Sequence, residues 1–209
     1  MNKIKAIVFD MDGVLIRAKH WHFKALNSAL RLFGLNISLR EHLRHFEGLP
    51  TKTKLAMLSQ RHNLPKNLHT FINEMKQIYT LKAVNAYCVP NKTRKNTLKR
   101  LKSEGYQIAL CSNSIAKTIE AMMNKADLMV YLDFFLSNED VKMPKPSPEI
   151  YQKAIRRLNL KPQEVLIVED NINGIKAARA SKAHLMQIKN ITEVNYKNIK
   201  SFIAKCERR

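Results

Sequence analysis

The most informative segment of this sequence is residues 4–14, IKAIVFDMDGV. Its first half is an almost continuous apolar run rich in β-branched residues, which predicts a strand buried on both faces, as parallel strands between helices are. The run ends at Asp10 and Asp12, and Gly13 follows, so both carboxylates can converge where the chain leaves the strand. In open α/β sheets, ligands bind at this edge, outside the carboxyl ends of the strands.

Two carboxylates so close together repel each other unless a cation lies between them, and Mg2+ is a hard cation that prefers oxygen ligands. With such an ion in place, Asp10 can attack phosphorus as a nucleophile. Asp12 can then move a proton for the leaving group and later for water. The same D-x-D-G sequence is also compatible with a plain turn and helix-capping acids, so other segments must decide.

Residues 9–15, FDMDGVL, resemble the first motif of the haloacid dehalogenase superfamily, most of whose members are phosphatases. The chain looks similar to the β-phosphoglucomutase and phosphoglycolate phosphatase-like subfamily. This resemblance implies an α/β fold with a doubly wound, Rossmann-like parallel sheet as its core. It also implies a small all-helical cap domain inserted after the first motif, and Mg2+ as the cofactor.

A second polar cluster follows the strand that we predict over residues 106–111. Ser112 and Asn113 lie where this strand ends and a helix begins, so a hydroxyl, an amide and free backbone N–H groups can bind a phosphate together. A role for Ser112 as a simple helix N-cap is compatible with this. The segment resembles the family's second motif, which implies that Ser112 contacts a phosphoryl oxygen. We also assign Asn113 and Gly13 to substrate binding.

Lys145 lies among prolines at positions 144, 146 and 148, which restrict the backbone and predict a stiff loop. A rigidly presented ammonium can offset the repulsion between an aspartate nucleophile and a phosphate dianion. The alternative is a surface turn with an incidental lysine, and Lys142 is a nearby competitor. The sequence KPSPEIY at 145–151 resembles the family's third motif, which selects Lys145, although Pro144 stands where relatives often carry glycine.

The last candidate segment is an apolar strand over residues 165–168 that ends at Glu169 and Asp170. An alanine-rich helix follows, and the whole segment resembles the family's fourth motif, whose acids complete the metal site. The resemblance implies that Asp170 is a direct ligand and that Glu169 binds the metal directly or through water. The full set of predicted Mg2+ ligands is Asp10, Asp12, Asp170 and Glu169.

A long segment with helical spacing and no convincing strand lies between the first two predicted strands. We expect residues 17–87 to form the cap domain, and residues 1–16 and 88–209 to form the core. A cap that closes over the site excludes water from the reacting phosphorus and lets remote substrate groups decide what enters. The cap therefore predicts a small substrate that is enclosed during the reaction.

Charged residues flank a predicted break between two helices of the cap. Glu47, Lys52 and Lys54 are candidate specificity contacts, although ordinary surface charges of a helix turn would look the same. Two residues depart from the family's pattern. Arg17 stands at the hinge where relatives often carry an acid, and Ser181 stands where they often carry glycine. The first puts hinge behaviour or substrate contacts in doubt, and the second alters only a turn.

The composition is that of an ordinary globular protein, with 45% hydrophobic and 26% charged residues among 209. No stretch approaches the roughly 18 apolar residues of a membrane span, and no signal peptide is apparent, so we expect a cytoplasmic protein without a membrane partner. Three scattered cysteines argue against disulfides and zinc. His20 and His22 lack a second cluster of ligands, so we expect packing or a substrate contact there.

The formal net charge is +20, from 37 basic and 17 acidic residues. Such an excess can indicate a nucleic-acid partner. Here the basic residues are spread along the chain, and the densest run, residues 92–102, has the pattern of one solvated helix face. We therefore expect no nucleic-acid partner, while the positive field favours the approach of a phosphate ester. The sequence leaves the oligomeric state open, since it has no long heptads.

These features predict Mg2+-dependent hydrolysis of a phosphomonoester of a small metabolite, such as a sugar or polyol phosphate. Asp10 would form an aspartyl-phosphate, and Asp12 would act as acid and base. Lys145 and Ser112 would contact the phosphoryl oxygens. A sugar phosphomutase would use the same intermediate and is the first alternative. The second is a basic binding protein without catalysis on the same fold.

Overall fold

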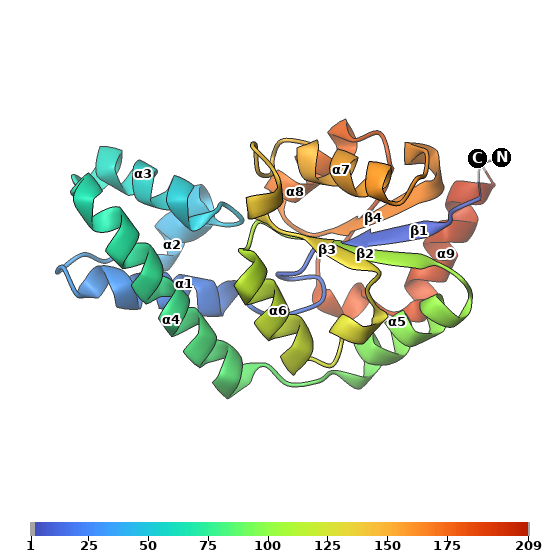
Figure 1. Cartoon of the computed structure of the whole chain (residues 1–209), viewed down its shortest axis with the longest axis horizontal. Helices are drawn as coiled ribbons and strands as arrows, with labels where there is room; N and C mark the ends of the chain where they lie inside the picture. Colours follow the sequence, from blue (N-terminus) through green and yellow to red (C-terminus); the bar gives the residue numbers. More distant parts are fainter. Residues whose placement is uncertain (1–2, 209) are drawn as a thin grey trace.

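The computed structural model describes residues 3–208, and its core is a five-stranded parallel sheet (Figure 1). The strand order is β3-β2-β1-β4-β5, so β1 lies in the centre. The strands are β1 (Ala6–Phe9), β2 (Gln107–Cys111), β3 (Phe134–Leu136), β4 (Val165–Glu169) and β5 (His184–Gln187). The predicted fold, a doubly wound parallel sheet with helices around it, is confirmed.

Helices cover both faces of the sheet, which is why its central strands are apolar throughout. Ile7 and Phe9 of β1 belong to the apolar cluster on one face, and Ala6 and Val8 belong to the cluster on the other. The first face is covered by α5 (Lys92–Ser103), α6 (Ala116–Lys125) and α9 (Tyr196–Glu207). The second face is covered by α7 (Glu149–Arg157) and α8 (Ile172–Ala180), whose alanines allow close packing.

Short 3-10 helices form several of the connections in the core. They are η3 (Met129–Tyr131), η4 (Asn138–Asp140), η5 (Pro162–Glu164) and η6 (Ile191–Glu193). Helix α9 begins at Tyr196, shortly after η6 ends at Glu193. The side chain of Asn195 then accepts a hydrogen bond from the backbone N–H of Asn198 and caps α9.

A separate group of helices follows β1 and lies to one side of the sheet (Figure 1). It consists of α1 (Lys19–Arg31), α2 (Leu39–Glu41) with the π-helical turn η1 (His42–Phe46), α3 (Thr51–His62), η2 (Lys66–Leu68) and α4 (His69–Tyr87). These helices share an apolar cluster of their own, which includes Leu26, Phe46 and Ile72. We call this group the cap and propose residues 17–87 as its bounds.

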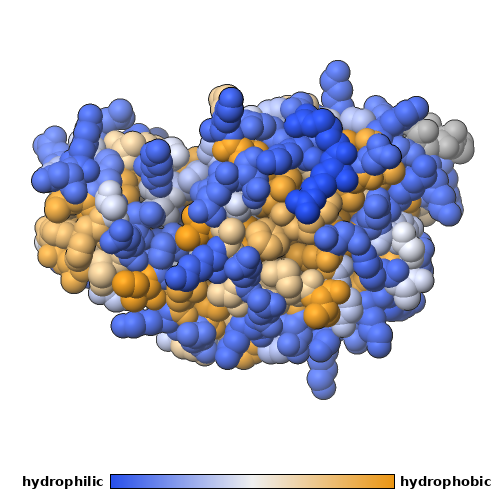
Figure 2. Space-filling view, viewed as in Figure 1, coloured by the Kyte–Doolittle hydropathy of each residue, from blue (hydrophilic) through white to orange (hydrophobic). Residues whose placement is uncertain are grey.

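The cap meets the core near the two linkers that join them. Trp21 in α1 packs against the main apolar cluster of the core, and its ring lies 6.4 Å from the ring of Tyr87 at the end of α4. Figure 2 shows hydrophilic side chains over much of one face, with apolar side chains gathered over part of the cap. Among the described helices, none is both long and apolar enough to cross a membrane.

Candidate active site

The candidate site lies at the carboxyl ends of the three central strands. Phe9 pairs with Leu110 of β2 and Val168 of β4, so the register places Asp10 at the ends of both neighbouring strands. Lys145 reaches this point from its proline-rich loop. Its ammonium donates hydrogen bonds to Asp10 Oδ1 at 2.7 Å, to Glu169 Oε1 at 2.6 Å and to the Cys111 carbonyl at 2.9 Å. Asp10 and Lys145, predicted from distant motifs, are therefore in contact.

The charges of this cluster depend on one another because all of its members are buried. Burial and the neighbouring Glu169 raise the pKa of Asp10 well above its usual range, although Lys145 opposes the shift. Burial alone would lower the pKa of Lys145, but Asp10 and Glu169 raise it overall. Lys145 therefore remains an ammonium, while Asp10 needs further positive charge to stay fully ionised.

The acids beside Asp10 fit a divalent cation. Oxygen atoms of Asp10, Glu169 and Asp170 all lie within 4.8 Å of one another. Asp170 Oδ1 is buried and has no hydrogen-bond partner among the described residues. Asp170 Oδ2 forms an ion pair with the Lys19 ammonium at 2.7 Å. Burial raises the pKa of Asp170 even so. An orphaned buried carboxylate oxygen beside a second carboxylate is a suitable position for a hard cation.

Glu169 has a different set of contacts from Asp170. Its Oε1 accepts hydrogen bonds from Lys145 and from the Tyr151 hydroxyl at 2.7 Å. Its Oε2 accepts from the backbone N–H groups of Asp170 and Asn171 at 3.0 and 3.2 Å. Both oxygens are thus engaged in this structure, and Glu169 is placed to orient the Lys145 ammonium.

Two glycines allow the acids to approach the backbone. A Cβ atom at Gly13 would lie 2.1 Å from Asp170 Oδ2, and a Cβ atom at Gly174 would lie 1.7 Å from Glu169 Oε1. Gly13 also has a φ of +97°, which favours glycine. In this structure Gly13 therefore makes room for an acid of the cluster, and its predicted contact with substrate stays a prediction.

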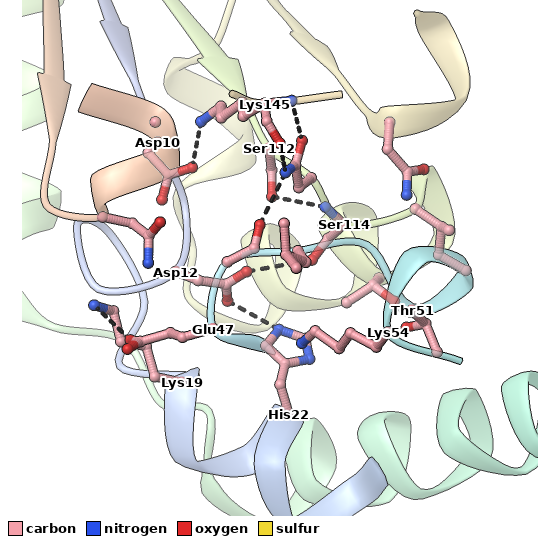
Figure 3. A pocket seen from close by; sticks show the side chains of 18 of the residues that line it. Asp10, Asp12, Lys19, His22, Glu47, Thr51, Lys54, Ser112, Ser114 and Lys145 are labelled. Atoms are coloured by element: carbon pink, nitrogen blue, oxygen red, sulfur yellow. Dashed lines mark hydrogen bonds and ion pairs between the residues drawn. The ribbon is translucent and has the colours of Figure 1, made fainter. Parts of the chain in front are cut away.

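Asp12 points toward the cap (Figure 3). Its Oδ1 lies 3.0 Å from His22 Nε2, and its Oδ2 accepts a hydrogen bond from the Ser114 hydroxyl at 3.2 Å. The carboxylate is not in the acidic group formed by the other three predicted ligands, so its role as a metal ligand stays a prediction. Burial raises the pKa of Asp12, but His22, Lys76 and Ser114 lower it overall.

His22 joins Asp12 to a lysine of the cap. Lys76 Nζ lies 3.4 Å from His22 Nδ1, on the opposite side of the ring from Asp12. Burial and the nearby Lys76 lower the pKa of His22, against the influence of Asp12. A neutral ring accepts a hydrogen bond at Nδ1 from the Lys76 ammonium and donates Nε2–H to Asp12, so the three groups form a chain of hydrogen bonds.

Ser112 and Asn113 follow β2 as predicted, with different contacts. Ser112 is buried, lines the cavity, and its hydroxyl accepts a hydrogen bond from the backbone N–H of Ser114 at 3.1 Å. Ile115, not Ser112, is the residue that precedes α6. Asn113 contacts the Lys145 backbone through both amide atoms and also donates to the Gly48 carbonyl at 2.9 Å. Asn113 thus connects the lysine loop to the cap.

The cap is closed over the site. Lys19 of the cap pairs with Asp170 of the core and with Glu47 at 3.0 Å, and the Glu47 carbonyl accepts a hydrogen bond from the Asn173 side chain at 3.3 Å. A Cβ atom at Gly48 would lie 2.5 Å from Asn171 Oδ1, so this turn requires glycine for its approach to the core. The cavity between cap and core has a volume of about 280 Å³ and is lined by Asp10, Asp12, Ser112, Lys145 and several cap residues (Figure 3).

Four residues that contact the predicted ones were not expected from the sequence, and these are Lys19, Ser114, Lys76 and Tyr151. His22 was expected only to pack or to contact substrate. The sequence did carry a signal for His22 and for Lys76. His22 precedes the buried residues Ala25 and Leu26 by one helical turn, and Lys76 lies one turn from the buried Ile72. A polar residue on the buried face of a helix indicates a specific partner.

Comparisons with known proteins identify the family of this chain. A profile described as haloacid dehalogenase-like hydrolase matches residues 7–188. The phosphorylated carbohydrates phosphatase of Thermotoga maritima is 27% identical over 181 residues, which cover 85% of this chain and 82% of that protein. The probable pseudouridine-5′-phosphatase of Saccharomyces cerevisiae is 28% identical over 196 residues, which cover 88% of this chain and 82% of that protein.

A solved structure shows the same fold over the whole chain. The β-phosphoglucomutase of Clostridium difficile superimposes with a TM-score of 0.84 at 21% identity, over 99% of this chain and all of that one. The helical cap and the parallel sheet are therefore both present in a known enzyme.

Proposed function

Because the chain belongs to the haloacid dehalogenase-like hydrolase family, as the sequence predicted, we propose that it hydrolyses phosphomonoesters of small metabolites with Mg2+ as cofactor. The observation that carries this proposal is the contact of Lys145 with Asp10 beside a buried carboxylate, Asp170, that has a free oxygen. The name of the Thermotoga relative, a phosphatase of phosphorylated carbohydrates, supports a sugar or polyol phosphate as substrate.

Asp10 and Asp170 are the residues that would bind the metal ion. The ion would supply positive charge to the phosphoryl oxygens and would keep Asp10 ionised against the burial that raises its pKa. Lys145 supplies a second positive charge at the same point, and Glu169 with Tyr151 orients it. The Asp10 carboxylate is thus kept available for attack on phosphorus.

The reaction then has two steps. An Asp10 oxygen forms a bond to phosphorus, the bond from phosphorus to the ester oxygen breaks, and the leaving alkoxide takes a proton from Asp12. In the second step Asp12 takes a proton from water, the water oxygen forms a bond to phosphorus, and the bond from phosphorus to Asp10 breaks, which releases phosphate and restores the carboxylate. His22 lowers the pKa of Asp12, which favours the ionised carboxylate that the second step needs as a base. In the first step the negative charge of a bound phosphate raises the pKa of Asp12 again, which favours the protonated form that the leaving group needs.

The test is a phosphate-release assay over sugar and polyol phosphates with Mg2+. Wild type should release phosphate, and Asp10→Asn should reduce the rate by at least about 1,000-fold, because it removes the nucleophile. Asp127→Asn, at an exposed carboxylate away from the cavity, is the matched control and should behave as wild type. Release that is equal in wild type and Asp10→Asn would refute the proposal. Isomer formation without free phosphate would instead identify a phosphomutase.

A further inference from the structure

The wall of the cavity on the cap side contains two buried lysines. Lys54 of α3 and Lys76 of α4 each have 7% of their surface exposed, and both line the cavity. Among residues 3–208, no carboxylate lies within ion-pair distance of either ammonium, and Lys76 Nζ contacts only a ring nitrogen of His22. Buried ammonium groups without an acidic partner are unusual in proteins.

The two buried ammonium groups destabilise the protein when no ligand is bound. Burial and the adjacent Lys76 lower the pKa of Lys54 to about 7, and burial lowers the pKa of Lys76 to about 8. Leu55, the residue after Lys54, and Ile72, one turn before Lys76, belong to the apolar cluster of the cap, so both lysines begin beside this cluster and extend into the cavity. Stability of the fold therefore does not explain two lysines here.

The acids of the site neutralise them only in part: Asp12 raises the pKa of both lysines and Glu47 that of Lys54, but burial outweighs these effects. Asp12 is bonded to His22 and Ser114, and Glu47 is paired with Lys19. Lys54 extends from the cap toward His22, on the far side of Asp12 from the Asp10–Lys145 cluster (Figure 3). A phosphoryl group on Asp10 has its own cation in Lys145. The two cap lysines face the other end of whatever fills the cavity.

We propose that Lys54 and Lys76 form a subsite for a second anionic group of the substrate, a carboxylate or a second phosphate. This inference rests on the proposed function and narrows its substrate class to small phosphate esters that carry two anionic groups. The cavity of about 280 Å³ is consistent with a small metabolite of this kind. An anion between the two ammonium groups would relieve their repulsion and replace the water lost on closure.

The experiment compares esters that differ in the second anionic group. One pair is 3-phosphoglycerate and glycerol 1-phosphate, which tests a carboxylate, and the other is glucose 1,6-bisphosphate and glucose 1-phosphate, which tests a phosphate. Wild type should prefer the doubly anionic member of one pair in kcat/KM. Lys54→Met should lower kcat/KM for that member by about tenfold or more, and by less than about threefold for its partner.

Two further variants control this result. Lys54→Arg keeps the charge and should retain the preference, while Lys66→Met removes an exposed charge of the cap and should behave as wild type. An equal loss for both members of a pair would place Lys54 at the transferred phosphoryl group and overturn the subsite. Preference for the singly anionic ester in both pairs would overturn it as well.

A binding measurement separates this inference from the proposed function. Calorimetry with the Asp10→Asn protein reports binding of the four esters without turnover. If wild type hydrolyses none of them, the Lys54 subsite is still supported when Asp10→Asn binds a doubly anionic ester at least about tenfold more tightly than its partner and Lys54→Met abolishes the difference. It is overturned when Asp10→Asn shows no such difference.

Discussion

Replacement of Lys54 by methionine should stabilise the protein when no ligand is bound. The pKa of Lys54 is about 7 in the folded protein, against 10.5 for an unperturbed lysine. This difference corresponds to a loss of at most roughly 4–5 kcal/mol in the free energy of unfolding. Methionine has a similar length and carries no charge, so it removes the cost of burying an ammonium. We expect Lys54→Met to raise the free energy of unfolding by about 3 kcal/mol near pH 6.5, as measured by urea denaturation.

The pH dependence of this gain has a definite sign. Between about pH 7 and pH 10 the unfolded chain binds a proton at Lys54 that the folded chain does not, so the stability of wild type rises with pH in this window. The gain from Lys54→Met should therefore be largest at and below about pH 7 and should shrink to roughly 1–2 kcal/mol near pH 9. Lys66→Met should change stability by less than about 0.5 kcal/mol. A gain for Lys54→Met that is no larger than for Lys66→Met, or that grows with pH, would refute the reasoning.

Three more substitutions test the core of the site. Gly174→Ala should lower the free energy of unfolding by roughly 3 kcal/mol in urea, because its Cβ displaces the Glu169 carboxylate from its bonds. Lys19→Met should tighten Mg2+ binding by roughly fivefold in calorimetry, since its ammonium pairs with the Asp170 carboxylate and repels a cation bound there. His22→Ala should lower kcat for phosphate release by about tenfold or more, with a smaller change in KM, because it removes the donor to the catalytic carboxylate.

Each of these substitutions has a neighbour that serves as a control. Ile172→Ala on the exposed side of α8, Lys24→Met on the surface of α1 and His20→Ala should each leave the corresponding measurement near wild type. A Gly174→Ala protein as stable as wild type would show that the Glu169 contacts carry little free energy. Unchanged Mg2+ affinity in Lys19→Met, or unchanged kcat in His22→Ala, would remove the role assigned to that residue.

The sheet and the acids at its edge were predictable because their signals are local. An apolar run with β-branched residues forms a central strand whatever surrounds it, and carboxylates directly after two such runs meet when the strands are neighbours. Asp10 and Asp170 each follow a strand of this kind. Lys145 was identified by the stiff loop around it and by the resemblance of that loop to a family motif.

The contacts between cap and core were not predictable in the same way. Whether His22 meets Asp12 depends on the angle at which the cap packs, and no local pattern in the sequence encodes that angle. Glu169 shows a related difficulty. Its position after a strand indicates a metal ligand, whereas its two oxygens are engaged by Lys145, Tyr151 and backbone N–H groups that only the folded structure brings together.

The position of Trp21 gives the protein an internal optical signal. It is the sole tryptophan of the chain, and it lies in the first cap helix while packing against the apolar cluster of the core. Any swing of the cap away from the sheet changes how much water surrounds this indole ring, and its emission shifts accordingly. Opening and closing can thus be timed in unlabelled protein, from the fluorescence of one residue.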